Sequence, residues 1–106
     1  MEKPPLEKII EKLEQLDARA WKLETDYCFI TKVSGLTVHV FKFEDLERTR
    51  YKLELVDDDG YQRVSYTSYN AEEKDMLEGF YKNISQKYHQ VKEEEFKEMI
   101  NNLLTD

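Results

Sequence analysis

The sequence has few of the residues that interrupt regular structure. Its 106 residues include three glycines and two prolines. Flexible linkers usually need more of both, so we expect one globular domain over residues 1–106. Three scattered glycines cannot build a phosphate-binding loop, and none of the common nucleotide-binding or nucleophile-elbow motifs is present.

Reactive and metal-binding side chains are also scarce. There is one cysteine, Cys28, and there are two histidines, His39 and His89. A single cysteine excludes an intramolecular disulfide, which is typical of the reducing cytoplasm. The three residues have no short ligand spacing, so we expect no metal site and no cofactor. An isolated cysteine in an apolar segment is usually a packing residue, so we predict no catalytic residue and no enzyme.

Long hydrophobic runs are missing as well. No stretch approaches the roughly 18 apolar residues of a membrane-spanning helix. The beginning of the sequence, MEKPPLEKII, mixes acids and bases and lacks the apolar centre of a signal peptide. We therefore expect a cytoplasmic protein without a membrane partner.

Basic residues are outnumbered. The 16 lysines and arginines face 23 aspartates and glutamates, which gives a net charge of -7. Proteins that bind nucleic acids or anionic membranes normally present basic patches, so we expect neither as a direct partner. The acidic balance instead favours a basic protein as partner.

The order of hydrophobic periodicities predicts an α+β fold. Apolar residues recur every three or four positions in residues 4–20, which predicts an amphipathic helix. Alternating patterns then predict an antiparallel four-stranded meander of residues 27–33, 36–43, 51–56 and 61–68, with the last and least apolar strand at an edge.

Residues 71–106 again show helical periodicity, with two apolar stripes. A single helix of this length would be about 50 Å long, too long to lie on a four-stranded sheet. We therefore expect a break or bend between Lys87 and Glu93. The result would be one long bent helix or two helices, packed on one face of the sheet.

One turn predicts a specific strand register. Ser34-Gly35 is a two-residue hairpin signal, around which residue i should face a residue near 69 minus i. Cys28 would then pair with Phe41 and lie diagonal to His39.

The stretch VDDDGYQRVSYTSYN, residues 56–70, resembles a calcium loop at first sight. With Gly60 at the sixth position of such a loop, Leu55 and Tyr66 occupy the first and last positions, where calcium needs oxygen ligands. Asp59-Gly60 instead predicts a two-residue hairpin turn in which both residues have positive φ. Asn70 is the predicted N-cap of the following helix, with an acid three residues later.

Tyrosines and acids gather in and after this stretch, and they form our predicted partner-binding surface. Tyrosine offers a large rigid contact area, and neighbouring carboxylates attract a basic partner. The alternative is that the strand places Tyr61 or Tyr66 in the core. The predicted partner-binding residues are Tyr61, Tyr66, Tyr69, Asp57, Asp58, Glu72 and Glu73.

The leading hypothesis is therefore a non-enzymatic module that binds a basic protein through this acidic, tyrosine-bearing surface.

One alternative is an inhibitor whose carboxylates imitate nucleic acid and occlude the site of a nuclease or another DNA- or RNA-binding protein. The order of elements in a small acidic chain resembles some phage-encoded inhibitors of bacterial defence nucleases, and equally many small bacterial proteins; no motif is shared. A further alternative is an assembly protein that forms homodimers or larger oligomers through a helical stripe, either in the first helix or from Phe96 to Leu104.

Overall fold

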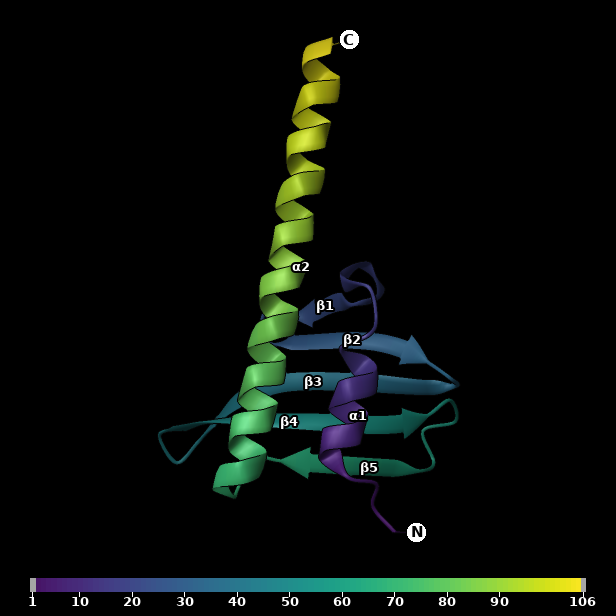
Figure 1. Cartoon of the computed structure of the whole chain (residues 1–106), viewed down its shortest axis with the longest axis vertical. Coiled ribbons are helices and arrows are strands. Elements are labelled where there is room, and N and C mark those ends of the chain that lie inside the picture. The colour runs from purple at the N-terminus through teal and green to yellow at the C-terminus, as the bar shows by residue number, and fades with distance from the viewer. Residues whose placement is uncertain (1, 106) are drawn as a thin grey trace.

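The computed structural model of the protein describes residues 2–105. Its helices are α1 (Leu6–Leu13), the short 3₁₀ helix η1 (Ala18–Ala20) and α2 (Ala71–Thr105). Its strands are β1 (Lys22–Thr25), β2 (Cys28–Val33), β3 (Leu36–Asp45), β4 (Arg48–Asp57) and β5 (Arg63–Thr67). The predicted α+β class is confirmed: α1 and α2 lie on the same face of one antiparallel sheet (Figure 1).

The sheet is a meander in which each strand pairs with the next, in the order β1-β2-β3-β4-β5. It has five strands where the sequence predicted four. The additional strand is β1, which is separated from β2 by a turn at Asp26 and Tyr27. No glycine, proline or asparagine marks that turn, and a two-residue turn preserves the alternation of apolar residues, so the pattern conceals it. β5 lies at an edge, as predicted.

The β2–β3 hairpin follows the predicted register. Ser34 and Gly35 form its turn, with φ of 53° and 77°. Cys28 pairs with Phe41, and His39 lies two pairs further along the ladder, on the same face. This register matters below because it places the cysteine and the histidine side by side.

The β4–β5 connection differs from prediction. Its loop comprises residues 58–62, and Gly60 has a positive φ of 71° whereas Asp59 does not. The carbonyl oxygen of Asp57 accepts a hydrogen bond from the N–H of Gly60 at 3.0 Å. The predicted two-residue turn is therefore wrong, because this longer loop needs a left-handed residue at the glycine alone.

A tight turn without glycine joins β3 to β4. Residues 44–50 lie between the strands predicted from the sequence, but both strands extend into this range and leave Leu46 and Glu47 as the turn. These two residues have φ of 50° and 66°. Side chains other than glycine and asparagine lose roughly 1–2 kcal/mol in this left-handed region. The long β3–β4 ladder holds the turn in a conformation that its residues disfavour.

One hydrophobic core lies between the helices and the sheet. Alternate residues of each strand face the helices, whereas the opposite face of the sheet has no helix over it within residues 2–105 (Figure 1). Edge-to-face aromatic contacts connect α2 to the other side of the core. The ring centroids of Trp21 and Phe80 are 6.0 Å apart, and those of Phe29 and Tyr81 are 5.6 Å apart. The buried core residues are Leu6, Ile10, Leu13, Trp21, Phe29, Val38, Val40, Tyr51, Leu53, Tyr66, Leu77, Phe80, Tyr81 and Ile84.

α1 is shorter than its periodicity predicted. It ends at Leu13, where the N–H of Leu16 bonds three residues back to the Leu13 carbonyl and tightens the last turn. Asp17 then begins η1, and its side chain accepts a hydrogen bond from the N–H of Arg19 at 2.8 Å. The aspartate caps a new turn, so the helical pattern of the sequence runs past the end of the helix.

α2 is one continuous helix, and the predicted break between Lys87 and Glu93 is wrong. Its start is as predicted, because the side-chain oxygen of Asn70 accepts the N–H of Glu73 at 2.8 Å. α2 crosses the strands and then continues beyond the sheet (Figure 1). Five strands about 4.8 Å apart span only about 20 Å, whereas a helix of 35 residues measures about 52 Å. The part of α2 that exceeds the width of the sheet therefore projects beyond it as a continuous helix. Within residues 2–105, no helix is both long and apolar enough to cross a membrane.

Candidate functional site

The three tyrosines of the predicted partner-binding surface lie in different places. Tyr66 is 3% exposed and belongs to the core, and its hydroxyl donates a hydrogen bond to the carbonyl of Pro4. Tyr61 and Tyr69 are 87% and 68% exposed. They lie at opposite ends of β5, whose five residues span about 17 Å. The tyrosines therefore do not form one surface, since the strand separates two of them and buries the third.

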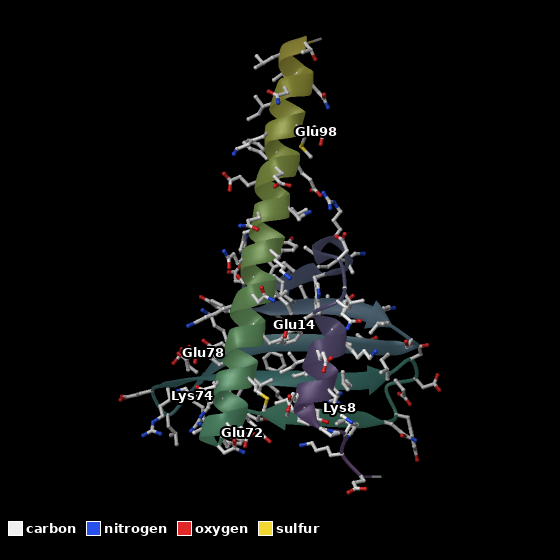
Figure 2. The ribbon with its side chains drawn as sticks, in the orientation of Figure 1. Lys8, Glu14, Glu72, Lys74, Glu78 and Glu98 are labelled. Atoms are coloured by element: carbon white, nitrogen blue, oxygen red, sulfur yellow. The ribbon has the colours of Figure 1, made fainter. Side chains whose placement is uncertain are left out.

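The predicted acids have local structural roles. One side-chain oxygen of Asp57 accepts the N–H of Tyr61 at 2.8 Å and so closes the β4–β5 loop. Glu72 and Glu73 lie in the first turn of α2, where negative charge is favourable to the helix dipole. Figure 2 labels Glu72 at this end of the helix. Asp58 is exposed in the loop. The structure thus places Asp57 and Asp58 beside Tyr61, and Glu72 and Glu73 after Tyr69.

The surface beside Tyr69 is mixed in charge. A cleft of about 490 Å³ opens there, lined by residues from the start of β4 and the start of α2, among them Arg48, Arg50 and Lys74. The guanidinium of Arg50 donates to the carbonyl of Ser68 at 2.8 Å and lies 5.0 Å from the centroid of the Tyr69 ring. The sequence pattern did not reveal Arg48 and Arg50 here, because β4 brings them from some twenty residues away.

On the face of the sheet opposite α1 and α2, Cys28 and His39 lie together as the predicted register requires. The Sγ atom of Cys28 lies 4.0 Å from Nδ1 of His39. A carboxylate oxygen of Glu24, on β1, lies 4.0 Å from the same nitrogen. The sequence pattern did not reveal Glu24, because the alternation of apolar residues runs through β1 and β2 without a break. We call Glu24, Cys28 and His39 the open-face cluster.

The open-face cluster is not arranged as a nucleophile with a relay. In such a relay one ring nitrogen faces the nucleophile and the other faces the carboxylate, but here both neighbours approach Nδ1. Burial raises the pKa of the Cys28 thiol, and the charges of Glu24 and Glu54 raise it further. A thiol held in its protonated form is a poor nucleophile.

The part of α2 beyond the sheet carries a second set of apolar side chains. We call residues 92–105 the distal segment, and no residue in it is buried. Its large apolar side chains are exposed, and they form what we call the distal stripe: Phe96, Met99, Ile100, Leu103 and Leu104. Figure 2 labels Glu98 on this segment, well beyond the strands.

The distal stripe does not continue the face of α2 that packs on the sheet. Successive residues of an α-helix are about 100° apart around the axis. On this scale the core-facing residues from Leu77 to Tyr88 share one sector, and the distal stripe is centred about 100° away from it. The sequence showed both stripes, but not this rotation between them; summing the angle from Leu77 to Phe96 would have revealed it.

No family model matches the chain, no curated protein matches it in sequence, and no solved structure matches its fold. Two features within residues 2–105 therefore remain to be explained by their own chemistry. They are the distal stripe and the open-face cluster.

Proposed function

We propose that the protein is a non-enzymatic assembly module that pairs with a second copy of itself through the distal segment of α2, in antiparallel orientation. The observation that supports this proposal is the distal stripe: five large apolar side chains exposed on one face of a helix that projects from the domain. Contiguous exposed apolar surface of this kind is uncommon on monomers and typical of protein contacts.

The stripe is not needed for the chain's own core. All four buried residues of α2, Leu77, Phe80, Tyr81 and Ile84, precede the distal segment. Because the stripe is rotated by about 100° from the core-facing sector, a modest bend of α2 toward the sheet would not bury it. Another chain can bury it, and α2 already presents it on an ordered helix.

The distribution of charge along the segment favours an antiparallel second copy. Residues 92–98 hold four glutamates and two lysines, whereas residues 99–105 hold no charged residue. Antiparallel pairing about a point near Ile100 places the charged half of each helix against the uncharged half of the other. Parallel pairing would place glutamates against glutamates. The antiparallel arrangement is also isologous, as in most two-fold homodimers.

The spacing of the stripe fits such a pair. Phe96, Met99 and Leu103 follow one another at intervals of three and four, which is the spacing of a helix–helix seam. Phe96 of one copy would pack near Leu103 of the other. Two short ion pairs flank the seam, Lys92 with Glu95 at 3.6 Å and Lys97 with Glu93 at 3.4 Å.

The strength of the pair follows from the apolar area. Fully burying a large apolar side chain contributes about 1.5–3 kcal/mol, and the stripe residues are between 39% and 77% exposed in the single chain. The two stripes together would contribute on the order of 10 kcal/mol. Association costs roughly 4–15 kcal/mol. We therefore expect a concentration-dependent pair with a dissociation constant in roughly the micromolar range or above.

Sedimentation velocity over a wide range of protein concentration tests the proposal. We expect a monomer–dimer equilibrium for the unaltered protein and a monomer at all concentrations for Leu103→Glu, because the new carboxylate lies in the seam. Asn101→Glu adds the same charge two residues away on the opposite side of the helix, and should leave the equilibrium unchanged. A monomer at every concentration of the unaltered protein, or equal loss of pairing in both variants, would refute self-pairing.

A second candidate function is the docking of a basic protein on the acidic and tyrosine-bearing surface predicted from the sequence. It is supported by the net charge of -7 and by Tyr61, which is 87% exposed in the same loop as Asp58. Tyr61→Ala should then weaken a complex with a defined basic partner, and the complex should weaken further as salt increases.

An inhibitor that imitates nucleic acid stays a prediction of the sequence; it requires that excess DNA or RNA displace the protein from its target.

A further inference from the structure

We propose that Glu24, Cys28 and His39 bind one zinc-class divalent cation on the face of the sheet opposite α1 and α2. These three side chains come from three successive strands, β1, β2 and β3. Their ligand atoms, a carboxylate oxygen, Sγ and Nδ1, all lie within 4.8 Å of one another. This inference does not depend on the distal segment or on self-pairing.

The distances suit a tetrahedral metal. Zinc bonds of about 2.3 Å to sulfur and about 2.0–2.2 Å to nitrogen and oxygen imply ligand atoms roughly 3.4–3.6 Å apart at tetrahedral angles. The Sγ–Nδ1 and Oε2–Nδ1 separations are both 4.0 Å. These two pairs need to approach by about half an ångström, and the Sγ–carboxylate pair, which lies within 4.8 Å, by at most about 1.2 Å; side-chain rotations can provide both movements. The carboxylate of Glu24 is half exposed and free to make this movement.

The backbone brings the ligands together in two steps. The β2–β3 register makes Cys28 and His39 diagonal neighbours on one face, since Cys28 pairs with Phe41 and Ile30 pairs with His39. The β1–β2 register shifts between Leu23 and Thr25, which leaves Glu24 in a β-bulge. A bulge changes the direction of its side chain, and bulges often lie next to functional sites. Here the bulge residue is the third ligand.

The chemistry of the donor set selects the metal. Thiolate and imidazole favour borderline or soft cations such as zinc over magnesium and calcium, which prefer oxygen ligands. A thiolate, a carboxylate and a neutral imidazole together balance the two charges of the cation. Glu54, paired with His39 across β3 and β4, adds negative potential nearby, although its carboxylate is 3.6 Å from Lys52 and from Arg63. Three protein ligands leave a fourth position open for water or for an external ligand.

The cation would also connect β1 to the rest of the sheet. β1 is a four-residue edge strand interrupted by the bulge. A bond from Glu24 through the metal to β2 and β3 would hold this edge in place. Metal binding should therefore slow amide hydrogen exchange in β1 more than elsewhere.

Cobalt(II) titration of the metal-free, reduced 106-residue protein tests the site. We expect one equivalent to bind, with a thiolate-to-cobalt charge-transfer band and the visible bands of tetrahedral cobalt, and we expect one equivalent of zinc to remove both. Excess magnesium should remove neither. Absence of a saturable charge-transfer band in the unaltered protein, or its removal by magnesium, would overturn the proposal.

Variants of each ligand then identify the site. Cys28→Ser should abolish the charge-transfer band. Changes to residues that only support metal ligands typically weaken metal binding by about 10-fold or more. Glu24→Gln and His39→Gln remove ligands themselves, so each should weaken cobalt binding more than about 10-fold. His89→Gln, which removes the other histidine at an exposed position of α2, is the matched control and should bind as the unaltered protein does. Circular dichroism of each variant checks that it is folded. Equal weakening in His89→Gln, or unchanged binding in the folded Glu24→Gln and His39→Gln proteins, would show adventitious binding only and reject the site.

Discussion

Two leucines on the same helix provide a direct test of how α2 is used. Leu77 is 0% exposed and packs in the core, whereas Leu103 is 74% exposed in the distal stripe. Leu77→Ala removes a fully buried side chain and leaves a cavity, which costs about 2–5 kcal/mol of the free energy of unfolding. Leu103→Ala removes a side chain that is mostly in water already, and alanine is slightly the better helix former. We expect its cost in the monomer to be below about 0.5 kcal/mol.

Urea unfolding followed by far-ultraviolet circular dichroism measures both changes. The protein should be dilute enough to be monomeric, because a dimer would add stability that depends on concentration. For a domain of this size, the Leu77→Ala midpoint should fall by roughly 1–3 M urea, and the Leu103→Ala midpoint should stay in place. At high concentration, Leu103→Ala should lose the extra stability that pairing gives the unaltered protein. The interpretation of α2 is wrong if dilute Leu103→Ala loses more than about 1 kcal/mol, or if Leu77→Ala loses less than that.

Two further predictions concern the sheet and the core. The β3–β4 turn holds Leu46 and Glu47 at positive φ, so the double change Leu46→Asn with Glu47→Gly should raise the free energy of unfolding by about 1–2 kcal/mol; a lower urea midpoint would contradict the assignment of strain. Burial raises the pKa values of Tyr51, Tyr66 and Tyr81 above 10.0. Their contribution to stability is fully present below about pH 10 and is lost as the pH rises above it, because the unfolded chain ionises these tyrosines first. A spectrophotometric titration should show a late-titrating group of tyrosines that coincides with alkaline unfolding, and ionisation of all seven near pH 10 without unfolding would disprove their burial.

The parts of the fold that the sequence predicted correctly are those with short-range causes. Ser34-Gly35 has residues that accept positive φ, so the hairpin and its register could be predicted. The side chain of Asn70 caps the helix that follows it, as its position three residues before Glu73 suggested. The polar composition of the last strand predicted an edge. Each of these depends on a few neighbouring residues.

The missed parts of the fold are those in which the local pattern predicts a different structure from the one that forms. The Leu46–Glu47 turn is adopted against local preference because the β3–β4 ladder on both sides stabilises it. The end of α1 could not be predicted because the apolar spacing continues past the residue at which Asp17 caps the next turn. The predicted break in α2 assumed that the helix must lie on the sheet, although a helix can remain regular in water beyond it.

The same division applies to the functional residues. Composition alone indicates an acidic chain with one cysteine and no motif of a known active site. The helical periodicity of the sequence also showed the distal stripe, because the spacing of its apolar residues is local. Whether a tyrosine in β5 is buried or exposed depends on what covers the strand, and the structure covers Tyr66 while leaving Tyr61 in water.

The sequence by itself determined the α+β class, the net negative charge and the pairing of β2 with β3, because periodicity, charge and turn chemistry act over a few residues. Only the tertiary structure decided that α2 extends beyond the five-stranded sheet and leaves the distal stripe unburied. Only the tertiary structure brought Glu24 beside Cys28 and His39, through a bulge and two strand pairings. The first feature depends on how α2 packs across strands far from it in the sequence, and the second depends on a β-bulge that no local pattern marks.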